Sequence, residues 1–375
     1  MTRRGALPMR FIVVPALLLA ACSSASPTPD GSRAPSPAAS ATAAASAAAS
    51  SAPSAAPSEV VTGWRQLAVD GGPSAREDHT WTQAPDGATA YLFGGRTTDN
   101  TPLADLWAFD LASDTWQEVA PAGGGPAARF GHNAVWAEGI GLVVFAGQAG
   151  TSFFNDLWAF DPATNAWEQL PAGGAVPVAR YGSCAAIGPD GRLWISHGFT
   201  SEGSRFADTA AYDFTAGTWS DETPVGDRPV ERCLHGCWWS SSGQLTLYGG
   251  QTNGILALGD LWALTPGPRA GTNAWAEVQL EGGPPADRNL YASAPLDSSL
   301  QLVFGGQTHE GELLNDAWVV VSDGAVEPFE AGGTAPPARY AAELIYHAER
   351  SRFLLFGGRG ADGALDDLWE LTPAS

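Results

Sequence analysis

The sequence predicts an all-β fold, a six-bladed β-propeller in which the N-terminal strand pairs with the C-terminal blade. A unit of about 50 residues recurs six times over residues 59–375. Each unit holds short strand-like segments separated by turn residues, and the last unit is one segment short. A small sheet with two apolar faces is not stable alone, so the units must stack, and a ring protects their edges.

The first residues of the chain have the pattern of an export signal. Three arginines within the first ten residues precede the apolar run 11–20, which is too short to cross a bilayer, since spanning takes about 20 residues. The run ends in Leu-Ala-Ala-Cys, which resembles a bacterial lipobox. This pattern predicts a signal peptide over 1–21 and lipidation of Cys22, and hence an extracytoplasmic protein anchored to the bacterial cell membrane. Ordinary cleavage with an incidental Cys22 is the alternative.

Residues 22–58 have the composition of a disordered tether. Nearly all of them are Ala, Ser, Pro or Thr. Such a segment has too little apolar side-chain area to offset the entropy lost when it becomes ordered. We therefore expect three parts, with the propeller over 59–375 as the folded domain.

The charge of the chain excludes some partners. All 19 basic residues are arginines, against 40 acidic residues, and the net charge is −21. A protein this acidic repels nucleic acids and anionic lipid surfaces. We expect a monomer that binds no nucleic acid and carries no cofactor, and whose membrane contact is the lipid on Cys22.

Each repeated unit opens with an arginine and carries an aspartate before its third strand. The arginines, spaced by 51 to 56 residues, are Arg76, Arg129, Arg180, Arg232, Arg288 and Arg339. The aspartates, mostly within Asp-Leu-Trp, are Asp105, Asp156, Asp208, Asp260, Asp316 and Asp367. The first and third strands begin at the same end of a blade, so we expect Arg–carboxylate bonds there. A ligand is rarely six-fold symmetric, and both sets are therefore predicted to be structural.

A glycine pair after the second strand and a further aromatic residue complete the pattern. The double glycine, the Asp-Leu-Trp unit and the spaced tryptophan together resemble the kelch repeat, over residues 60–375. The tryptophans are expected to be buried between blades.

The end of the last unit predicts how the ring closes. That unit stops after its third strand, at residues 369–371, and has no later tryptophan segment. Residues 64–67, ahead of the first unit, match the missing strand of the other units. We therefore expect the two ends of the domain to pair in one blade.

The loops between the second and third strands are the candidate binding positions, because loops on a rigid scaffold commonly carry function. Each has a similar length and a divergent sequence. The residues that directly follow the glycine pairs are Arg96, Gln148, Phe199, Gln251, Gln307 and Arg359. These side chains would suit a carbohydrate or an acidic peptide; the alternative is that they form a solvated rim.

Three histidines share a position three residues after the repeat arginine. His79, His132 and His235 suggest a metal site, but equivalent positions in different blades are generally too far apart to bind one ion. We expect them to pack in the blades, without a metal.

The cysteines predict one disulfide. With Cys22 lipidated, three remain, so one thiol must stay unpaired in the monomer. Cys233 and Cys237 are expected in one strand, where four residues span about 13 Å, and this exceeds the ~7 Å separation of Cα atoms that a disulfide allows. Cys184 and Cys237 lie at similar levels in neighbouring units and on opposite faces, so we expect a bond between them, with Cys233 free.

Two classes of function follow from the sequence. It contains no nucleophile elbow, metal-ligand cluster or phosphate-binding loop, which favours a binding module at the cell envelope for a glycan or protein ligand. The alternative comes from the resemblance, because galactose oxidase and bacterial sialic acid mutarotases have kelch-type propellers. It implies a carbohydrate-active enzyme, such as a copper oxidase or a mutarotase.

The lipobox generates a direct prediction. Metabolic labelling with a fatty-acid analogue should tag the wild-type protein, and Cys22→Ala should abolish the label, because the thiol is the acylated group. Label retained in Cys22→Ala, detected by gel fluorescence, would contradict the anchor.

Overall fold

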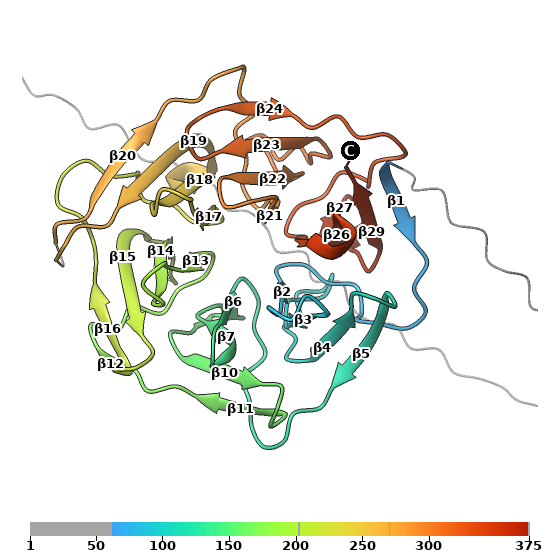
Figure 1. The fold of residues 1–375 in the computed structure, drawn as a ribbon, viewed down its shortest axis with the longest axis horizontal. Helices are drawn as coiled ribbons and strands as arrows, with labels where there is room; N and C mark the ends of the chain where they lie inside the picture. Colours follow the sequence, from blue (N-terminus) through green and yellow to red (C-terminus); the bar gives the residue numbers. More distant parts are fainter. Residues whose placement is uncertain (1–61, 202, 270, 374–375) are drawn as a thin grey trace, which may run out of the picture. The chain divides into compact units, whose positions relative to one another are not determined.

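The computed structural model describes residues 62–201, 203–269 and 271–373. These residues form a six-bladed β-propeller whose blades surround a central axis (Figure 1). The predictions for the signal peptide 1–21, for Cys22 and for the tether 22–58 lie outside the described residues. The predicted all-β fold class is confirmed.

Each blade is an antiparallel sheet whose first strand lies nearest the axis. Blade 1 contains β2 (Thr80–Gln83), β3 (Thr89–Phe93), β4 (Leu106–Asp110) and β5 (Thr115–Val119). Blade 2 contains β6 (Asn133–Ala137), β7 (Gly141–Phe145), β10 (Leu157–Asp161) and β11 (Ala166–Gln169), with the hairpin β8 (Gln148–Ala149) and β9 (Ser152–Phe153). Blade 3 contains β13 (Cys184–Ile187), β14 (Leu193–Phe199), β15 (Arg205–Asp213) and β16 (Thr218–Asp221), with β12 (Gly173–Gly174) parallel to β16.

The second half of the ring repeats the arrangement. Blade 4 contains β17 (Gly236–Trp239), β18 (Leu245–Thr252), β19 (Leu256–Thr265) and β20 (Ala274–Val278), with the 3-10 helix η1 (Asn253–Ile255). Blade 5 contains β21 (Ala292–Pro295), β22 (Leu300–Phe304), β23 (Ala317–Val321) and β24 (Val326–Pro328). Blade 6 contains β25 (Glu343–His347), β26 (Arg352–Phe356), β29 (Leu368–Thr372) and β1 (Gly63–Leu67), with the hairpin β27 (Arg359–Gly360) and β28 (Gly363–Ala364) and the 3-10 helix η2 (Ala348–Arg350).

Blade 6 is built from both ends of the domain. Strand β1 pairs antiparallel with β29 along its whole length, from Gly63 opposite Thr372 to Leu67 opposite Leu368. This is the pairing expected from the missing last segment of the sixth unit. Trp64 is 4% exposed and packs against Phe304 of blade 5, with ring centroids 5.0 Å apart.

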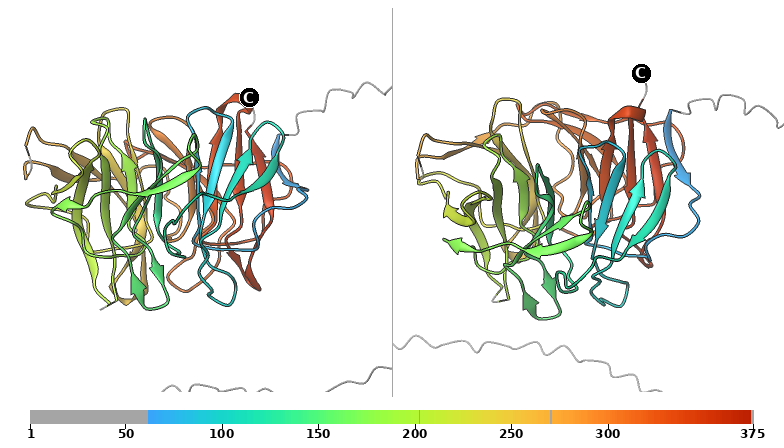
Figure 2. Two further views of the ribbon diagram at one scale, coloured as in Figure 1. Left: turned by 90° about the horizontal axis from the view of Figure 1, so that it is seen from below. Right: turned by 60° about the horizontal axis from the view of Figure 1, so that its bottom comes forward.

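The antiparallel order gives the ring two different ends. The loops between second and third strands and the connections between blades lie at one end, which we call the loop face. The tight turns between first and second and between third and fourth strands lie at the other, the turn face. Figure 2 shows the ring from the side, with the longer loops projecting from one end.

A buried ion pair recurs at the loop-face end of every blade. The six repeat arginines are at most 1% exposed. Arg129 is typical: its Nη1 and Nη2 donate to Oδ1 and Oδ2 of Asp156 at 2.7 and 2.9 Å, Nη1 also donates to the carbonyl of Ala146, and Nε donates to the carbonyl of Ala127. The partners in the other blades are Arg76–Asp105, Arg180–Asp208, Arg232–Asp260, Arg288–Asp316 and Arg339–Asp367.

The tryptophan of each Asp-Leu-Trp unit joins the same network. The indole Nε1 of Trp158 donates to Oδ2 of Asp156 at 2.8 Å, and four other blades repeat this bond. Burial raises the pKa of Asp156, but the hydrogen bonds and charge of Arg129 outweigh it, so the pKa lies below its usual value. Blade 3 has Ala210 in place of the tryptophan, and there the Arg–Asp pair stands without it.

The second aromatic residue of each unit joins neighbouring blades. Trp167 of blade 2 packs against Phe93 of blade 1, and Trp219 of blade 3 packs against Phe145 of blade 2. Trp116 of blade 1 contacts Phe356 of blade 6 in the same way. These three tryptophans therefore lie between blades, as predicted.

The glycine pair is required because neighbouring backbone lies too close to it to leave room for a side chain. Gly95 has φ +96°, and a Cβ there would lie 2.8 Å from the carbonyl oxygen of Glu77. The first position of the pair also has positive φ but tolerates Ala146 and His197, whereas the second is glycine in all six units.

The buried ion pairs generate a stability prediction. Arg339→Ala should lower the free energy of unfolding by about 3 to 5 kcal/mol, because it leaves Asp367 buried without its cation. Arg65→Ala is the control: its side chain is 52% exposed, and its partner Glu370 keeps Arg352, so the expected loss is below about 1 kcal/mol. Urea unfolding measures both values. Equal losses of unfolding free energy in the two variants would show that the repeat Arg–Asp ion pairs do not stabilise the loop face.

Candidate binding face

The six residues predicted as ligand contacts occupy equivalent places on the loop face. Each pairs through its backbone with the residue that follows a repeat arginine, and each is half-buried. The pairs are Arg96–Glu77, Gln148–Phe130, Phe199–Tyr181, Gln251–Cys233, Gln307–Asn289 and Arg359–Tyr340. The structure thus places the six around the loop-face end of the axis.

Two of the six converge on one carboxylate. The Oε1 atom of Glu77, a fully buried residue, lies 3.0 Å from Nε of Arg96 and accepts a 2.9 Å hydrogen bond from Nη1 of Arg359. Arg96 also forms a 2.8 Å ion pair with Asp78, and its guanidinium lies 4.5 Å from the ring centroid of Phe130. Both arginines therefore have internal partners, and Arg96 is part of the scaffold as well as of the face.

Asp78 extends this ionic cluster towards the axis. The hydroxyl of Tyr181 donates to Asp78 at 3.3 Å, reaching across blade 2, where a Cβ on Gly131 would lie 1.9 Å from the tyrosine ring. Burial raises the pKa of Asp78 to about 6, although Arg96 acts in the opposite direction. Burial also holds the pKa of Tyr181 well above its usual value.

The remaining four predicted residues make weaker or local contacts. Arg205 links two of them, because its Nη2 donates to Oε1 of Gln251 at 2.9 Å and its guanidinium lies 5.6 Å from the ring centroid of Phe199. Phe199 also contacts Phe153 of blade 2. Gln148 and Gln307 donate to carbonyl oxygens of their own loops. No single cluster in the described part of the chain unites all six.

Exposed hydrophobic side chains lie in the loop-face segments of blades 3 and 4. The large hydrophobic side chains that are exposed in the described part of the chain are Val176, Val178, Val225, Val230 and Leu256. The valines lie in connections that enter blades 3 and 4, and Leu256 follows the second strand of blade 4. Val225 is 87% exposed. Blades 3 and 4 lie across the ring from blades 1 and 6, where the Glu77 cluster lies (Figure 1).

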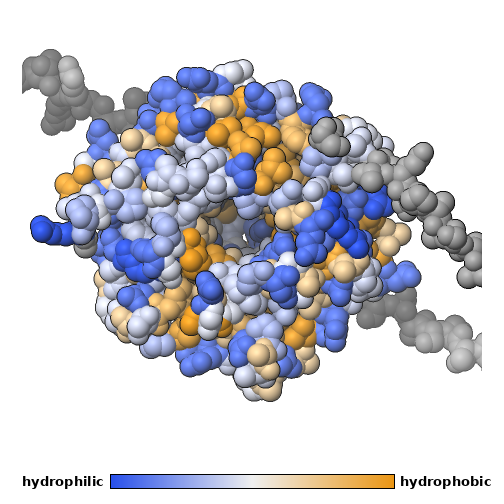
Figure 3. Space-filling model, viewed as in Figure 1, coloured by the Kyte–Doolittle hydropathy of each residue, from blue (hydrophilic) through white to orange (hydrophobic). Residues whose placement is uncertain are grey.

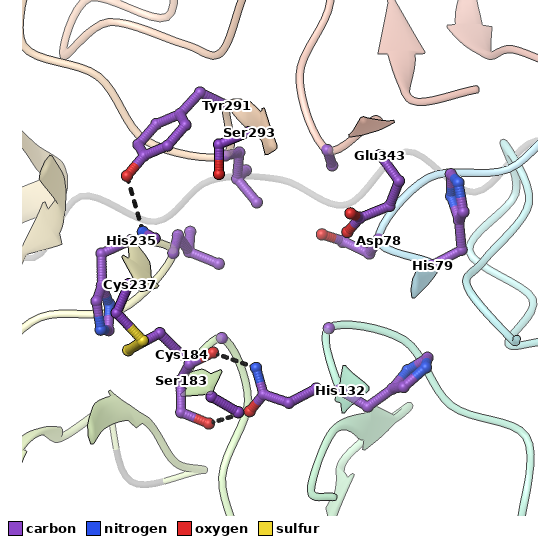
Figure 4. Close-up of a pocket in the computed structure, with 18 of the residues that line it drawn as sticks. Asp78, His79, His132, Ser183, Cys184, His235, Cys237, Tyr291, Ser293 and Glu343 are labelled. Atoms are coloured by element: carbon purple, nitrogen blue, oxygen red, sulfur yellow. Dashed lines mark hydrogen bonds between the residues drawn. A yellow bond between two sulfur atoms is a disulfide. The ribbon is translucent and has the colours of Figure 1, made fainter. Parts of the chain in front are cut away.

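The axis of the ring opens at the loop face into a polar cavity. Its walls include Asp78, Asn133, Ser183, Ser293 and Glu343, contributed by five different blades. Figure 4 shows the carboxylates of Asp78 and Glu343 directed toward one another in this space. Burial, and then the charge of Asp78, raises the pKa of Glu343 to about 8.

The three repeat-position histidines do not point into the cavity. His79, His132 and His235 are buried, and their rings turn away from the central space (Figure 4). His132 Nε2 lies 2.9 Å from the hydroxyl of Thr80. Burial lowers the pKa of all three. Among the described side chains, no group of three His, Cys, Asp or Glu residues is placed to hold a metal ion.

A disulfide joins Cys184 of β13 to Cys237 of β17 and lines the cavity, with a Cα–Cα separation of 5.7 Å. It links blades 3 and 4, which is the pairing expected from the sequence. Cys233 is a buried free thiol whose pKa is raised by burial. The expectation that Cys233 and Cys237 share one strand is wrong, since β17 begins at Gly236. Cys233 lies before this strand and pairs through its backbone with Gln251.

Several residues of the site were missed at the sequence level. Glu77, Asp78, Tyr181 and Glu343 lie one, two or four positions after a repeat arginine. Aligning the six units at these positions would have marked Glu77, Asp78 and Glu343, because each differs from its counterparts in the other blades, whereas Tyr181 shares its residue type with Tyr340 of blade 6. Within residues 62–201, 203–269 and 271–373, no helix has both the length and the apolar character needed to cross a membrane.

Comparison with known proteins identifies related sequences. The family model described as "KLHDC2/KLHL20/DRC7 Kelch-repeats domain" matches residues 60–244 and 216–375. Adagio protein 3 of Arabidopsis thaliana is 26% identical over 330 residues, which is 83% of this chain and 52% of that protein. Tip elongation aberrant protein 1 of Schizosaccharomyces pombe is 28% identical over 221 residues, 54% of this chain and 18% of that protein. The Leucine-zipper-like transcriptional regulator 1 homolog of Drosophila melanogaster is 30% identical over 241 residues, 60% of this chain and 23% of that protein.

The ionic cluster generates a second stability prediction. Arg96→Ala should lower the free energy of unfolding by about 3 kcal/mol, because Asp78 loses its ion pair and Glu77 loses one of its two arginines. Adding Glu77→Gln should recover part of that loss, which a double-mutant cycle in urea measures. An Arg96→Ala protein as stable as the wild type would instead identify Arg96 as a solvated residue reserved for ligand.

Proposed function

Because the chain belongs to the kelch-repeat family, we propose that it is a binding module that holds a protein partner across its loop face. The matched segment is one part of each longer relative, which suits a unit that binds another molecule. The observation that carries the proposal is the division of the loop face into an ionic side and an apolar side.

The ionic side lies at blades 1 and 6. Arg96, Arg359, Glu77 and Asp78 form a compact, mutually paired group there. Charge complementarity with such a group would orient a bound partner and select among partners. It would add little affinity, because a charge on the partner must compete with the internal ion pairs.

The apolar side lies at blades 3 and 4. Val225 and Val230 project from one inter-blade connection, and Val176 and Val178 from the connection before it. Protein interfaces combine an apolar centre with polar surroundings, and exposed apolar patches mark such sites. Valine side chains offer nothing to sugar hydroxyls, so we favour a protein over a glycan as ligand.

The location of the module is part of the proposal. Lipidation at Cys22 and a tether over 22–58 would hold the loop face away from the membrane while the domain samples nearby partners. The labelling of Cys22 tests this part independently of binding.

The binding proposal predicts a face-specific loss. The purified full chain is immobilised and exposed to an extract of the cells that produce it, and retained proteins are quantified by mass spectrometry after cross-linking. Val225→Asp with Val230→Asp should reduce a retained partner at least tenfold, because both charges would be buried in the interface.

The control variant changes the opposite face. Glu138 is exposed in the turn between β6 and β7, so Glu138→Arg should leave retention unchanged. A partner lost equally from both variants, or from neither, contradicts the loop face as the site. A glycan array is probed with the same three proteins; glycan binding that only the valine variant loses, without any retained protein, would replace the protein ligand by a glycan.

A further inference from the structure

Two adjacent residues on the loop face of blade 4 can react with each other. Asn253 and Gly254 lie in η1, between the second and third strands of that blade, and both are exposed. They lie apart from the axial channel, which is visible as a hollow in Figure 3, because neither lines its loop-face cavity or a second cavity at its turn-face end. The other seven asparagines of the sequence are followed by Thr, Ala, Asp or Leu, so Asn253 is the one asparagine that precedes a glycine.

The glycine leaves its own backbone nitrogen open. A side chain on the residue after an asparagine hinders the approach of that nitrogen to the asparagine amide, and glycine has no side chain. Gly254 has φ +79° and ψ +10°, and a Cβ built on it would meet no heavy atom within 4 Å from another part of the described chain. The nitrogen of Gly254 and the side-chain amide of Asn253 are therefore both accessible to water.

The guanidinium of Arg205 binds the oxygen on which negative charge develops when the amide is attacked. Its Nη1 donates to Oδ1 of Asn253 at 3.1 Å. Arg205 belongs to β15 of blade 3 and has two further contacts: Nη2 donates to Oε1 of Gln251 at 2.9 Å, and the guanidinium lies 5.6 Å from the ring centroid of Phe199. A cation held in this way beside a carbonyl oxygen stabilises the oxyanion formed by attack on that carbonyl.

We propose that Asn253 is a site of spontaneous deamidation, which converts it to an acidic residue. The backbone nitrogen of Gly254 loses its proton to a base in the solvent and forms a bond to Cγ of Asn253. The bond between Cγ and Nδ2 breaks, and Nδ2 takes a proton from water and leaves as ammonia. Water then opens the resulting five-membered succinimide at either carbonyl, which gives aspartate or isoaspartate. The net reaction consumes water and releases ammonia, without any oxidant or cofactor.

The reaction changes the charge of the loop face between blades 3 and 4. The oxygen that Arg205 binds becomes part of a carboxylate, and the ion pair stabilises the product. Thr252, the residue before Asn253, donates to the carbonyl of Glu231 at 2.6 Å, in the connection that carries Val230. The new charge thus arises next to a segment proposed to contact a partner, although the reaction itself does not depend on that function.

Asn100 is a matched control within the same molecule. It is exposed on the loop face of blade 1, and its Oδ1 accepts a hydrogen bond from Nη1 of Arg96 at 3.3 Å. Asn100 therefore also has an arginine contact, but the next residue is Thr101, whose side chain branches at Cβ. Asn253 should convert at least tenfold faster than Asn100.

The test is incubation of the purified full chain in buffers from pH 6 to 9, followed by peptide mapping with mass spectrometry and by anion-exchange chromatography. The peptide that contains Asn253 should gain the mass difference between an amide and an acid. A more acidic form of the protein should appear at the same rate. This rate should rise with pH, because the attacking nitrogen must lose its proton.

Variants separate the roles of the glycine and the arginine. Gly254→Ala should slow conversion at least tenfold. Because alanine is strained at positive φ, Asn253→Gln is the second variant: its longer side chain would have to form a six-membered ring, so conversion at this position should be lost. Arg205→Gln should slow conversion in the folded protein but not in urea, where no guanidinium is held at the amide.

Arg65→Gln is the matched control for the arginine variant, because it removes an exposed arginine of blade 6 and should leave the rate unchanged. Thermal melting confirms that each variant is folded. Conversion of Asn253 no faster than that of Asn100, or an unchanged rate in Gly254→Ala, overturns the proposed site. An unchanged rate in folded Arg205→Gln overturns the role of the guanidinium.

Discussion

A guanidinium that is removed from water must be fully paired, and six such groups determine the geometry of this domain. Each repeat arginine lies just before the first strand of its blade. Its guanidinium binds the aspartate that precedes the third strand and a backbone carbonyl that follows the second strand. Three strands of one blade are thereby fixed at the loop-face end. Because the desolvation cost is offset only when all these bonds are made, the loops they join have little freedom, and the face they form is rigid.

The same constraint separates scaffold from site. Residues that recur in every blade are engaged in the Arg–Asp–Trp network or between blades, so recognition depends on positions that vary. On the loop face these are Glu77, Asp78 and Arg96 on one side and the exposed valines of blades 3 and 4 on the other. Some of the variable residues also stabilise the fold, however. Glu77 is buried, so Arg96 and Arg359 stabilise it as well as contributing to the face.

The absence of lysine shapes the electrostatics of the channel. Every cationic side chain other than histidine is an arginine, and the repeat arginines all lie at the loop-face level of the ring. The cavity at the turn-face end of the channel has no arginine or histidine in its lining. The two ends of the channel therefore differ in chemistry, because paired ions lie beside the loop-face end, whereas the lining of the turn-face end holds no cationic side chain.

The sequence by itself determined the fold, because a propeller is specified locally: each unit carries its own turns, strands and arginine, and six copies in order leave little choice of architecture. It also predicted the role of the repeat arginines and aspartates, which depends only on where strands begin in a blade. Only the tertiary structure decided that Arg96 and Arg359 share Glu77, that Tyr181 reaches Asp78 across blade 2, and that the carboxylates of Asp78 and Glu343 face one another (Figure 4). These contacts join blades that are far apart in sequence, and their distances are set by the packing of the closed ring, which no single repeat encodes.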